Sequence, residues 1–528
     1  QCAACGNVNP EQIFNILEAR IVDEYGNETD QRRIGPDAWN EVFRAQMEVR
    51  VAKVPDGAEA LHSTFQPPGR LRQMAVFFKR DVLAKLANRQ YVLINLLEAP
   101  VLAFFMAFFL RYRNGAPGDA YVFRYNDNLP QYLFIAVIVA LFLGLSVAAE
   151  EIIRDRKIMQ REKFLSLSTS SYLLSKTGLL FLISAFQSLL FVLVGNAVLG
   201  IHGLGVQHWA VLFSTACFAN VLGLNVSASF NSAKVIYMMI PLLIIPQLMF
   251  SGIIVRFDKL HPWFASEKSV PWLGNIMASR WAYEGMAVAQ YMDNDYERIF
   301  YELDRRMKTA NWKKDIWARE LMERSARVRR VLADHEEPGK LAGDLALIKG
   351  ELAKEMRQMR GLDLPEIDQL TPGRVDNGTL DAVDASLKLL IEHYRNQYLT
   401  AERAKEARIA EMTATPELKR SYFSLMDANR NNNLADVVTN RNEVNLITES
   451  KGELVRKSDP IYLWPTEGGF FDAQFYAPVK RLFGHVLPTL WANTLLLWGM
   501  TALLWVALVS NFFPWLLGRF GGAARHAG

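Results

Sequence analysis

The chain has 528 residues, of which 51% are hydrophobic and 22% are charged, and its formal net charge is +4. This small net charge excludes an overall basic nucleic-acid-binding protein, and three cysteines are too few for a disulfide scaffold. The averages hide two unlike parts. Apolar runs dominate between residues 91 and 255, whereas 33 acidic and 30 basic residues lie among the 190 residues from 291 to 480.

Residues 1–70 are expected to be soluble. The opening QCAACGNVNPEQ has no basic stretch followed by an apolar run, so it is not a signal peptide. A start at Gln1 indicates the continuation of a longer polypeptide or a processed fragment. Cys2 and Cys5 form a lone CxxC pair, and a zinc site would need a second pair. Four apolar residues after Asn9-Pro10 follow helical spacing: Ile13, Ile16, Leu17 and Ile21.

Six apolar runs are each long enough to cross a bilayer, which takes about 20 helical residues. One such run could be a buried core helix, but six runs separated by polar joints favour an all-α membrane protein with six transmembrane helices. Five of these spans lie within residues 91–255. The runs are Tyr91–Leu110, Leu129–Ala149, Leu173–Leu199, Trp209–Phe230, Val235–Val255 and His485–Phe513.

Basic residues in the short loops indicate the orientation of the spans. Lys and Arg gather before the first run and after the second, whereas the loop after the third, IHGLGVQHW, has none. The loop after the first run also carries Arg111, Arg113 and Arg124, so the bias is incomplete. The orientation that best fits this distribution of basic residues is a multi-pass protein of the inner (plasma) membrane, with both ends in the cytoplasm and residues 291–480 outside.

Two segments beside the runs are expected to contact the membrane surface. Residues 71–90 predict an amphipathic connecting helix on the cytoplasmic side, and residues 256–290 predict a re-entrant element that dips into the outer leaflet. The apolar side of the first comprises Met74, Phe77, Phe78, Val82 and Leu86. The second carries aromatic residues suited to the interface, namely Trp263, Phe264, Trp272, Trp281 and Tyr283.

Residues 291–480 form an insertion between the fifth and sixth runs, and they predict an extracytoplasmic helical bundle. Apolar residues recur at intervals of three and four within 296–307, 345–359 and 383–394, with turn sequences between these stretches. Such stripes argue against disorder. The remaining residues, 481–528, are expected to hold the sixth span and a C-terminal tail.

Motifs of common enzyme classes are missing from the sequence. It contains no GxxxxGK[ST] phosphate loop, no HExxH and no GxSxG. We therefore predict no catalytic or metal-ligating residue. ATP and Mg²⁺ could act only through an ATPase domain that this sequence does not include.

The loop after the second run is strongly charged and reads EEIIRDRKIMQREK from Glu150 to Lys163. Glu150 and Arg154 have the spacing and order of a favourable i,i+4 ion pair on a helix. A cytosolic partner could push on such a helix and move two spans together. The charges alone favour a solvated surface helix with stabilising ion pairs.

This loop and several later stretches resemble the membrane domain of the G-subfamily ABC exporters (the white and pleiotropic-drug-resistance type). The opening Asn9-Pro10 stretch is similar to the tail of the family's ATPase domain. The outer loop between spans five and six is far shorter in the family than residues 291–480. The matching membrane-domain residues are Glu150 or Glu151, Arg161-Glu162, Ser171-Tyr172, Lys176, Pro246, Phe250-Ser251-Gly252 and Trp272 through Glu284.

The resemblance implies a function and a set of partners. An ATPase domain, upstream in the same polypeptide or separate, would drive a homodimer that exports a lipid or other amphipathic substrate by alternating access. Residues 1–70 would be the tail of that ATPase domain and a linker, and an external partner could bind residues 291–480. The residues implied in coupling to the ATPase are Glu150, Glu151, Arg154, Arg161 and Glu162.

A function of a different class remains open, namely a membrane scaffold or sensor that transports nothing. Its external helical bundle would bind a partner in the cell envelope, and the spans would transmit the change of shape. A phosphate loop in the sequence upstream of Gln1 would favour the transporter.

Several polar residues lie inside the predicted spans. Glu98, about two turns into the first span, should face protein or water or be protonated, and it fits either a substrate or proton role or helix packing. Lys176 is expected to reach the membrane surface, and Gln187, Asn220 and Asn225 are expected to form interhelical hydrogen bonds. Residues that could line an apolar pathway, or face lipid instead, are Tyr237, Met238, Met239, Leu242 and Met249.

Overall fold

The computed structural model divides the chain into two compact units, Gln1–Gln66 and Pro67–Gly528. The expected CxxC pair of Cys2 and Cys5, Asn9 and Lys163 lie outside the described residues. The structure describes residues 10–24, 28–48, 68–112, 120–162, 167–266, 268–334, 341–359, 365–465 and 468–523.

The first unit contains short elements: α1 (Pro10–Glu18), the antiparallel pair β1 (Arg20–Val22) and β2 (Glu28–Arg32), and α2 (Pro36–Phe43). The sequence prediction of a helix through Ile21 is wrong, because Ile21 lies in β1. Its carbonyl oxygen accepts a hydrogen bond from the Thr29 hydroxyl at 2.7 Å. The conformation of Ile21 is therefore set by the pairing of β1 with β2, and not by the helical spacing of the apolar residues before it.

Five helices of the second unit are long and apolar enough to span a membrane. The expected fifth span is a sixth apolar helix, α9 (Ala233–Met249), which has 17 residues and contains Pro241 and Pro246. The membrane protein predicted from the sequence is thus confirmed as all-α. The five long helices are α4 (Arg89–Leu110), α5 (Leu129–Ala148), α7 (Thr169–Leu199), α8 (Gly205–Ser229) and α18 (Thr489–Val509).

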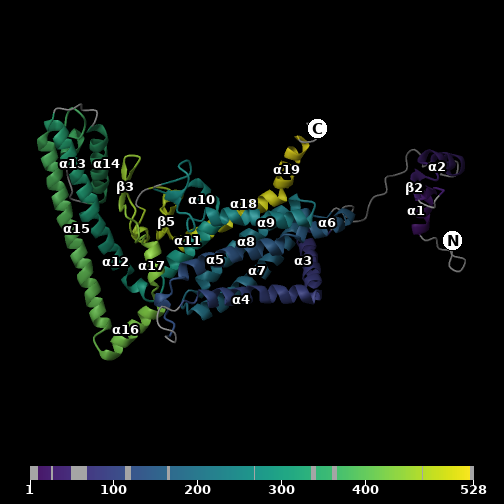
Figure 1. Ribbon diagram of the computed structural model, residues 1–528, viewed down its shortest axis with the longest axis horizontal. Coiled ribbons are helices and arrows are strands. Elements are labelled where there is room, and N and C mark those ends of the chain that lie inside the picture. The colour runs from purple at the N-terminus through teal and green to yellow at the C-terminus, as the bar shows by residue number, and fades with distance from the viewer. Residues whose placement is uncertain are drawn as a thin grey trace. The chain divides into compact units, whose positions relative to one another are not determined.

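Helix α8 lies at the centre of this bundle, in contact with α5, α7 and α18, and α4 packs on α7 at its edge (Figure 1). Small residues allow the close approach of α5 and α8: a Cβ atom on Gly144 would lie 2.6 Å from the Ala216 carbonyl oxygen. The predicted interhelical hydrogen bonds are present. Asn220 donates to the Ser184 hydroxyl at 2.8 Å, and Asn225 donates to the Leu504 carbonyl at 3.0 Å.

Two short helices lie at one end of the bundle. Helix α3 (Arg70–Ala87) lies across this end, and α6 (Glu151–Arg161) follows α5 there (Figure 1). We call this end of the bundle the α6 end, and the opposite one, where residues 291–480 pack, the insertion end. The buried residues of α3 are Gln73, Phe77, Asp81 and Lys85, so its packed face is more polar than predicted, and Leu86 is exposed.

The predicted re-entrant segment contains α10 (Trp272–Ile276) and α11 (Ala278–Met292). Trp263 and Trp272 are exposed, as expected of residues at a membrane interface. Trp281 and Tyr283 are not: both are fully buried, because α11 packs against α5, α8 and α18. The prediction that these two aromatic residues belong to an interfacial belt is therefore wrong.

The insertion is mainly helical, as predicted, and has a core of its own. Residues such as Trp317, Leu321, Leu345 and Leu387 form this core. Its helices are α12 (Glu297–Trp312), α13 (Ala318–Ala333), α14 (Ala342–Gln358), α15 (Asn377–Met412), α16 (Pro416–Asn429) and α17 (Asn432–Val438).

Two β-hairpins in this region were not predicted. They are β3 (Ile447–Ser450) with β4 (Glu453–Arg456), and β5 (Val479–Leu482) with β6 (His485–Pro488). The second hairpin includes His485, where the sequence prediction began the sixth span, so the helix begins four residues later at Thr489. The hairpin of β5 and β6 therefore leads directly into α18.

The insertion is joined to the bundle through buried polar contacts. Asn431, the N-cap residue of α17, donates to the carbonyl oxygens of Phe123 at 2.9 Å and Asn126 at 2.8 Å. The hydroxyls of Tyr291 and Tyr462 are 2.6 Å apart. These contacts connect residues far apart in the sequence and hold the base of the insertion against the ends of α5 and α11.

Glu297, the first residue of α12, is buried in this base. Its carboxylate lies 3.5 Å from the Arg430 guanidinium. Burial raises the pKa of Glu297 to about 7, with a further increase from Asp304, whereas Arg430 and Lys405 act in the opposite direction. The folded insertion therefore prefers Glu297 protonated below neutral pH.

Replacing Glu297 by Gln is expected to remove a pH dependence of stability. The pKa of Glu297 is about 7 in the folded chain and has its ordinary value of 4.5 in the unfolded chain. The contribution of Glu297 to the free energy of unfolding is therefore complete below about pH 4.5 and is lost as the pH rises to about 7. The loss amounts to roughly 3 kcal/mol. Thermal unfolding of both proteins between pH 5 and 8 measures it, and equal pH slopes would contradict the assignment.

Candidate functional site: an ion-pair cluster at the α6 end

Helix α6 begins immediately after α5 and is fixed at its first turn by α8. The backbone N–H groups of Ile152 and Ile153 donate to the Ser227 hydroxyl of α8 at 3.1 and 3.2 Å. Further along, Arg156 donates to the Ala228 carbonyl at 2.9 Å and also to Asn231. The first turn of a helix leaves backbone donors unpaired, so Ser227 satisfies two of them. Helix α6 is thus attached to the end of α8.

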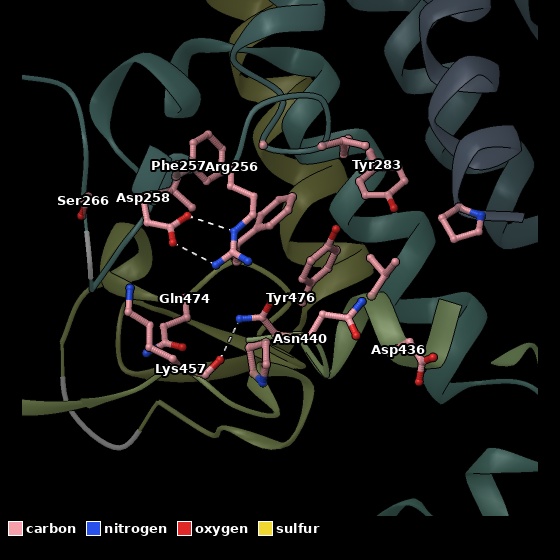
Figure 2. Close-up of a pocket in the computed structure, with 18 of the residues that line it drawn as sticks. Arg256, Phe257, Asp258, Ser266, Tyr283, Asp436, Asn440, Lys457, Gln474 and Tyr476 are labelled. Atoms are coloured by element: carbon pink, nitrogen blue, oxygen red, sulfur yellow. Dashed lines mark hydrogen bonds and ion pairs between the residues drawn. The ribbon is translucent and has the colours of Figure 1, made fainter. Parts of the chain in front are cut away.

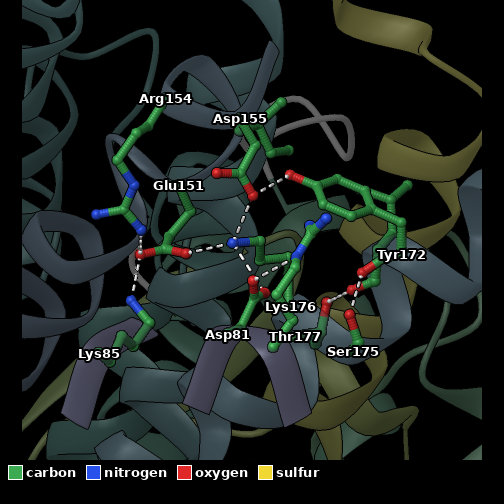
Figure 3. A network of polar contacts seen from close by, with 12 residues as sticks. Asp81, Lys85, Glu151, Arg154, Asp155, Tyr172, Ser175, Lys176 and Thr177 are labelled. Atoms are coloured by element: carbon green, nitrogen blue, oxygen red, sulfur yellow. Dashed lines mark hydrogen bonds and ion pairs between the residues drawn. The ribbon is translucent and has the colours of Figure 1, made fainter. Parts of the chain in front are cut away.

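Lys176, in the second turn of α7, is the centre of an ion-pair cluster (Figure 3). Its ammonium group lies 2.9 Å from Asp81, 3.0 Å from Glu151 and 2.7 Å from Asp155. Only 1% of Lys176 and 2% of Glu151 is exposed. An ammonium group has three donors, and three carboxylates surround this one within ion-pair distance.

Helix α3 completes this cluster, and we call the resulting set the Lys176 cluster: Asp81, Lys85, Glu151, Asp155 and Lys176. Lys85 forms an ion pair with the second oxygen of Glu151 and donates to the Tyr91 hydroxyl at 3.0 Å. The cluster joins α3, α6 and α7 beside an apolar contact, in which the rings of Phe77 and Tyr172 lie 5.7 Å apart.

Neighbouring hydrogen bonds reinforce the link between α3 and α7. The Ser171 hydroxyl donates to the Arg70 carbonyl at 2.9 Å, and the Ser168 N–H donates to Gln73 at 2.8 Å. The Tyr172 hydroxyl donates to Asp155 at 3.2 Å. The Ser171-Tyr172 pair of the sequence resemblance thus takes part in holding these helices together.

The predicted coupling residues have different positions. Glu151 belongs to the Lys176 cluster, whereas Glu150 is the N-cap residue of α6. Arg154 pairs with Glu151 at 3.1 Å instead of forming the expected ion pair with Glu150. Glu162 lies 3.6 Å from Arg80 of α3, and Arg161 is exposed at the end of α6.

Sequence reasoning missed three members of the cluster and misplaced a fourth. The prediction that Lys176 reaches the membrane surface is wrong, because the carboxylates of α3 and α6 cover it. Asp81 and Lys85 carry no sequence signal beyond lying within the amphipathic residues 71–90, and Asp155 none beyond lying within the charged loop 150–163. One signal was available: Gln73, Phe77, Asp81 and Lys85 recur every four residues, which places them on one face of α3.

The outer face of α6 is exposed. Four exposed residues, at i, i+3, i+4 and i+7, form this stripe. Three are basic and one is apolar, with 45% of Ile158 exposed. The stripe is Arg154, Lys157, Ile158 and Arg161.

The residues predicted to line a pathway share the exposed side of α9. Tyr237, Met238, Leu242 and Met249 are exposed and Met239 is half-buried, while Ile236 and Ile240 pack against the bundle. This geometry fits a pathway lining and a lipid-facing surface equally. Glu98 is half-buried beside the face of α4 that packs on α7.

A second buried charge cluster lies at the insertion end, around the fully buried Glu284 of α11. Its carboxylate lies 2.9 Å from Lys480 and 3.4 Å from Arg280, and accepts hydrogen bonds from Asn493 and from the Tyr476 N–H. Burial lowers the pKa of Lys480 to about 8, although Glu284 opposes the shift. This cluster ties α11, β5 and α18 together.

Residues 72–291 match the family model of the ABC-2 type transporter. These residues form an ABC-2 type permease domain. The match begins within α3, includes the Lys176 cluster, and ends at Tyr291, where the sequence predicts the insertion to begin. No curated protein matches the chain. Among the described parts of the permease and its insertion, no group of three or more His, Cys, Asp or Glu side chains is placed to hold a metal ion.

Proposed function

We propose that this chain is the membrane-spanning part of an ATP-driven exporter, and that α6 transmits the movement of an ATPase domain to the spans. The observation that carries the proposal is the Lys176 cluster, which fixes α6 to α3 and α7 while the opposite face of α6 stays exposed. The ABC-2 match supports the same function, because such permeases work with an ATPase partner.

The contacts suggest how a push on α6 would spread. Helix α6 continues from α5, is held to α8 by Ser227, and is held to α7 and α3 by Lys176 and Lys85. Breaking a buried ion pair costs about 3–5 kcal/mol. Movement of these helices together is therefore favoured over separation, and the ends of three spans would follow α6.

The transport cycle would require a second copy. In a homodimer, the exposed side of α9 would face its counterpart and enclose an apolar pathway for a lipid or another amphipathic substrate. ATP and Mg²⁺ would be bound by the ATPase domain, and its closure would turn the pathway outward. The orientation follows from the basic loops, with α6 in the cytoplasm and the insertion outside the inner membrane.

A scaffold or sensor is the second candidate, because the insertion has a separate core and could bind an envelope partner by itself. The two functions differ in one property. Only the exporter requires the exposed face of α6 to contact an ATPase.

The exposed face of α6 provides the test. Ile158→Asp places a charge on that face without touching the Lys176 cluster, so we expect transport per ATP hydrolysed to fall several-fold while the protein remains folded. The full transporter, with its ATPase, would be reconstituted in vesicles, with ATP turnover and flipping of a fluorescent phospholipid as readouts.

Leu389→Asp is the matched control, because Leu389 is an exposed apolar residue on α15 of the insertion. It should leave coupling unchanged. Equal coupling in both variants and the unmodified protein would remove α6 from the mechanism, and absence of ATP-dependent flipping even in the unmodified protein would favour the scaffold.

A further inference from the structure

A short helix, α19 (Phe512–Ala523), follows the last membrane span at the α6 end of the bundle. Asn511 lies between the two helices in the left-handed conformation, with a φ of 51°, and its carbonyl oxygen accepts a hydrogen bond from the Trp515 N–H at 3.1 Å. The chain therefore turns here and does not continue α18. Figure 1 shows α19 leaving the line of α18 and extending beyond the side of the bundle.

The short connection between the two helices places the start of α19 near the lipid headgroups. Two residues separate the end of α18 at Val509 from Phe512, and three Cα–Cα steps reach at most about 10 Å. The headgroup layer adds about 5–8 Å to each side of the hydrocarbon core. A helix that begins this close to the end of a span and then turns aside is in a position to lie along the membrane surface.

The exposed side of α19 combines aromatic rings with a positive charge. Phe512, Trp515 and Arg519 are exposed, and their spacing of three and four residues places them on one face of the helix. The two rings are 6.1 Å apart, and the guanidinium lies 4.5 Å from the centre of the Trp515 ring. Aromatic rings are enriched at membrane interfaces, and an arginine beside them can reach the headgroups. We call these three residues the α19 stripe.

Arg519 is not neutralised by a carboxylate of the described chain. Its contact is with the Trp515 ring, and it forms no ion pair within the part of the chain that the structure describes. The sequence contains no Asp or Glu after Asp472, so neither α18 nor α19 offers an acidic side chain. The charge of the α19 stripe is therefore free to bind a negative group from outside the chain.

Comparable arginines elsewhere in the chain have acidic partners. Arg305 lies 4.9 Å from the centre of the Trp464 ring and pairs with Glu302 at 2.7 Å. Arg256, in the wall of a cavity of about 430 Å³ at the insertion end, lies 2.9 Å from Asp258 (Figure 2). The arginine of the α19 stripe differs from both, because it has a ring contact without a carboxylate.

We propose that the α19 stripe binds the headgroup of an anionic phospholipid in the leaflet at the α6 end. The guanidinium would donate hydrogen bonds to the lipid phosphate, a geometry for which arginine is well suited, and the rings would lie at the level of the headgroups. In the orientation of the proposed function this is the cytoplasmic leaflet, whose surface potential is negative. Lipid binding itself does not depend on transport.

Lipid quenching in nanodiscs that hold the full chain tests the proposal. The three cysteines are replaced by alanine, and a bimane label is attached at Phe512→Cys, so that an aromatic label takes the place of a ring. Brominated phosphatidylglycerol or brominated phosphatidylcholine is then titrated into a phosphatidylcholine bilayer. We expect half-maximal quenching at a mole fraction of phosphatidylglycerol that is about 5-fold lower, the preference that one arginine at a membrane surface gives.

Two variants show which charge is responsible. Arg519→Gln should make the two lipids quench equally while quenching itself remains, because the aromatic side of α19 is unchanged. Arg305→Gln is the matched control, because Arg305 also lies over a tryptophan ring but on α12 of the insertion, and it should keep the preference for phosphatidylglycerol. Quenching by neither lipid, equal quenching before Arg519 is changed, or loss of the preference in the control would overturn the proposal.

The ATPase domain is the other candidate to cover the α19 stripe, since it would meet the same end of the bundle. Loss of ATP-driven flipping in Arg519→Gln, with the lipid preference unchanged, would assign the stripe to that domain and overturn the lipid site. A chain that prefers phosphatidylglycerol but shows no ATP-driven flipping would keep the lipid site and remove the exporter. The two proposals can thus fail separately.

Discussion

Replacing Lys176 by Met is expected to destabilise the protein by about 3–5 kcal/mol, the cost of removing one partner from a buried ion pair. Asp81 and Asp155 would lose the ammonium group at 2.9 and 2.7 Å, and Glu151 would retain only Lys85 and Arg154. The side chains are similar in length, so the change is mainly electrostatic. Thermal unfolding of the purified chain, followed by its helical signal, measures the loss.

Lys157→Met is the matched control, because Lys157 is an exposed residue of α6. Substitutions at such positions usually change stability by less than about 0.5 kcal/mol. In a second variant, Lys176→Met is combined with Glu151→Gln. Its loss in free energy of unfolding should be smaller than the sum of the losses from the two single changes, because both remove the same contact. Equal stability of the Lys176 and Lys157 variants would show that the cluster does not hold the helices together.

Replacing Glu284 by Ala should have an effect of the same size at the other end of the bundle. Lys480 and Arg280, each 1% exposed, would remain buried without their common carboxylate, and the Tyr476 N–H and Asn493 would lose an acceptor. We expect a loss of about 3–5 kcal/mol. Because Glu284 holds β5, protease cleavage near residues 476–488 should also become faster.

Glu302→Ala serves as its control. Glu302 is on α12 and is half exposed, and it pairs with Arg305 and Arg306 on the same helix. Surface pairs of this type contribute about 0–1 kcal/mol. If the Glu284 variant unfolded and was cleaved no faster than the Glu302 variant, the buried cluster would not be what fastens α18 and β5 to α11.

Five of the six expected membrane spans could be predicted because each is a contiguous apolar run of sufficient length, whereas α9, at the position of the fifth, has only 17 residues. The ABC-2 match over residues 72–291 confirms the resemblance at the level of the permease domain. The predicted start of the sixth span at His485 is wrong for a local reason. A run of apolar residues continues from β6 into α18, and composition does not distinguish a strand from a helix there.

The Lys176 cluster could be predicted only in part. Glu151 and Lys176 stood out through the resemblance, but their partners Asp81 and Lys85 lie on a helix distant in sequence, and no local pattern specifies which carboxylate a lysine will meet. The same limit applies to Trp281 and Tyr283. Aromatic side chains of this kind suit a membrane interface, but the packing of α11 against three helices buries them.

Membrane-impermeant thiol labelling of intact cells tests most directly whether α6 lies on the side of a cytoplasmic ATPase. Single cysteines would be placed at the exposed positions Lys157 of α6 and Lys388 of α15, after Cys2, Cys5 and Cys217 are replaced by alanine. Labelling at Lys388→Cys from outside, with Lys157→Cys labelled only after the membrane is opened, is the predicted result. Labelling of Lys157→Cys in sealed cells would place α6 on the wrong side of the membrane and contradict the account.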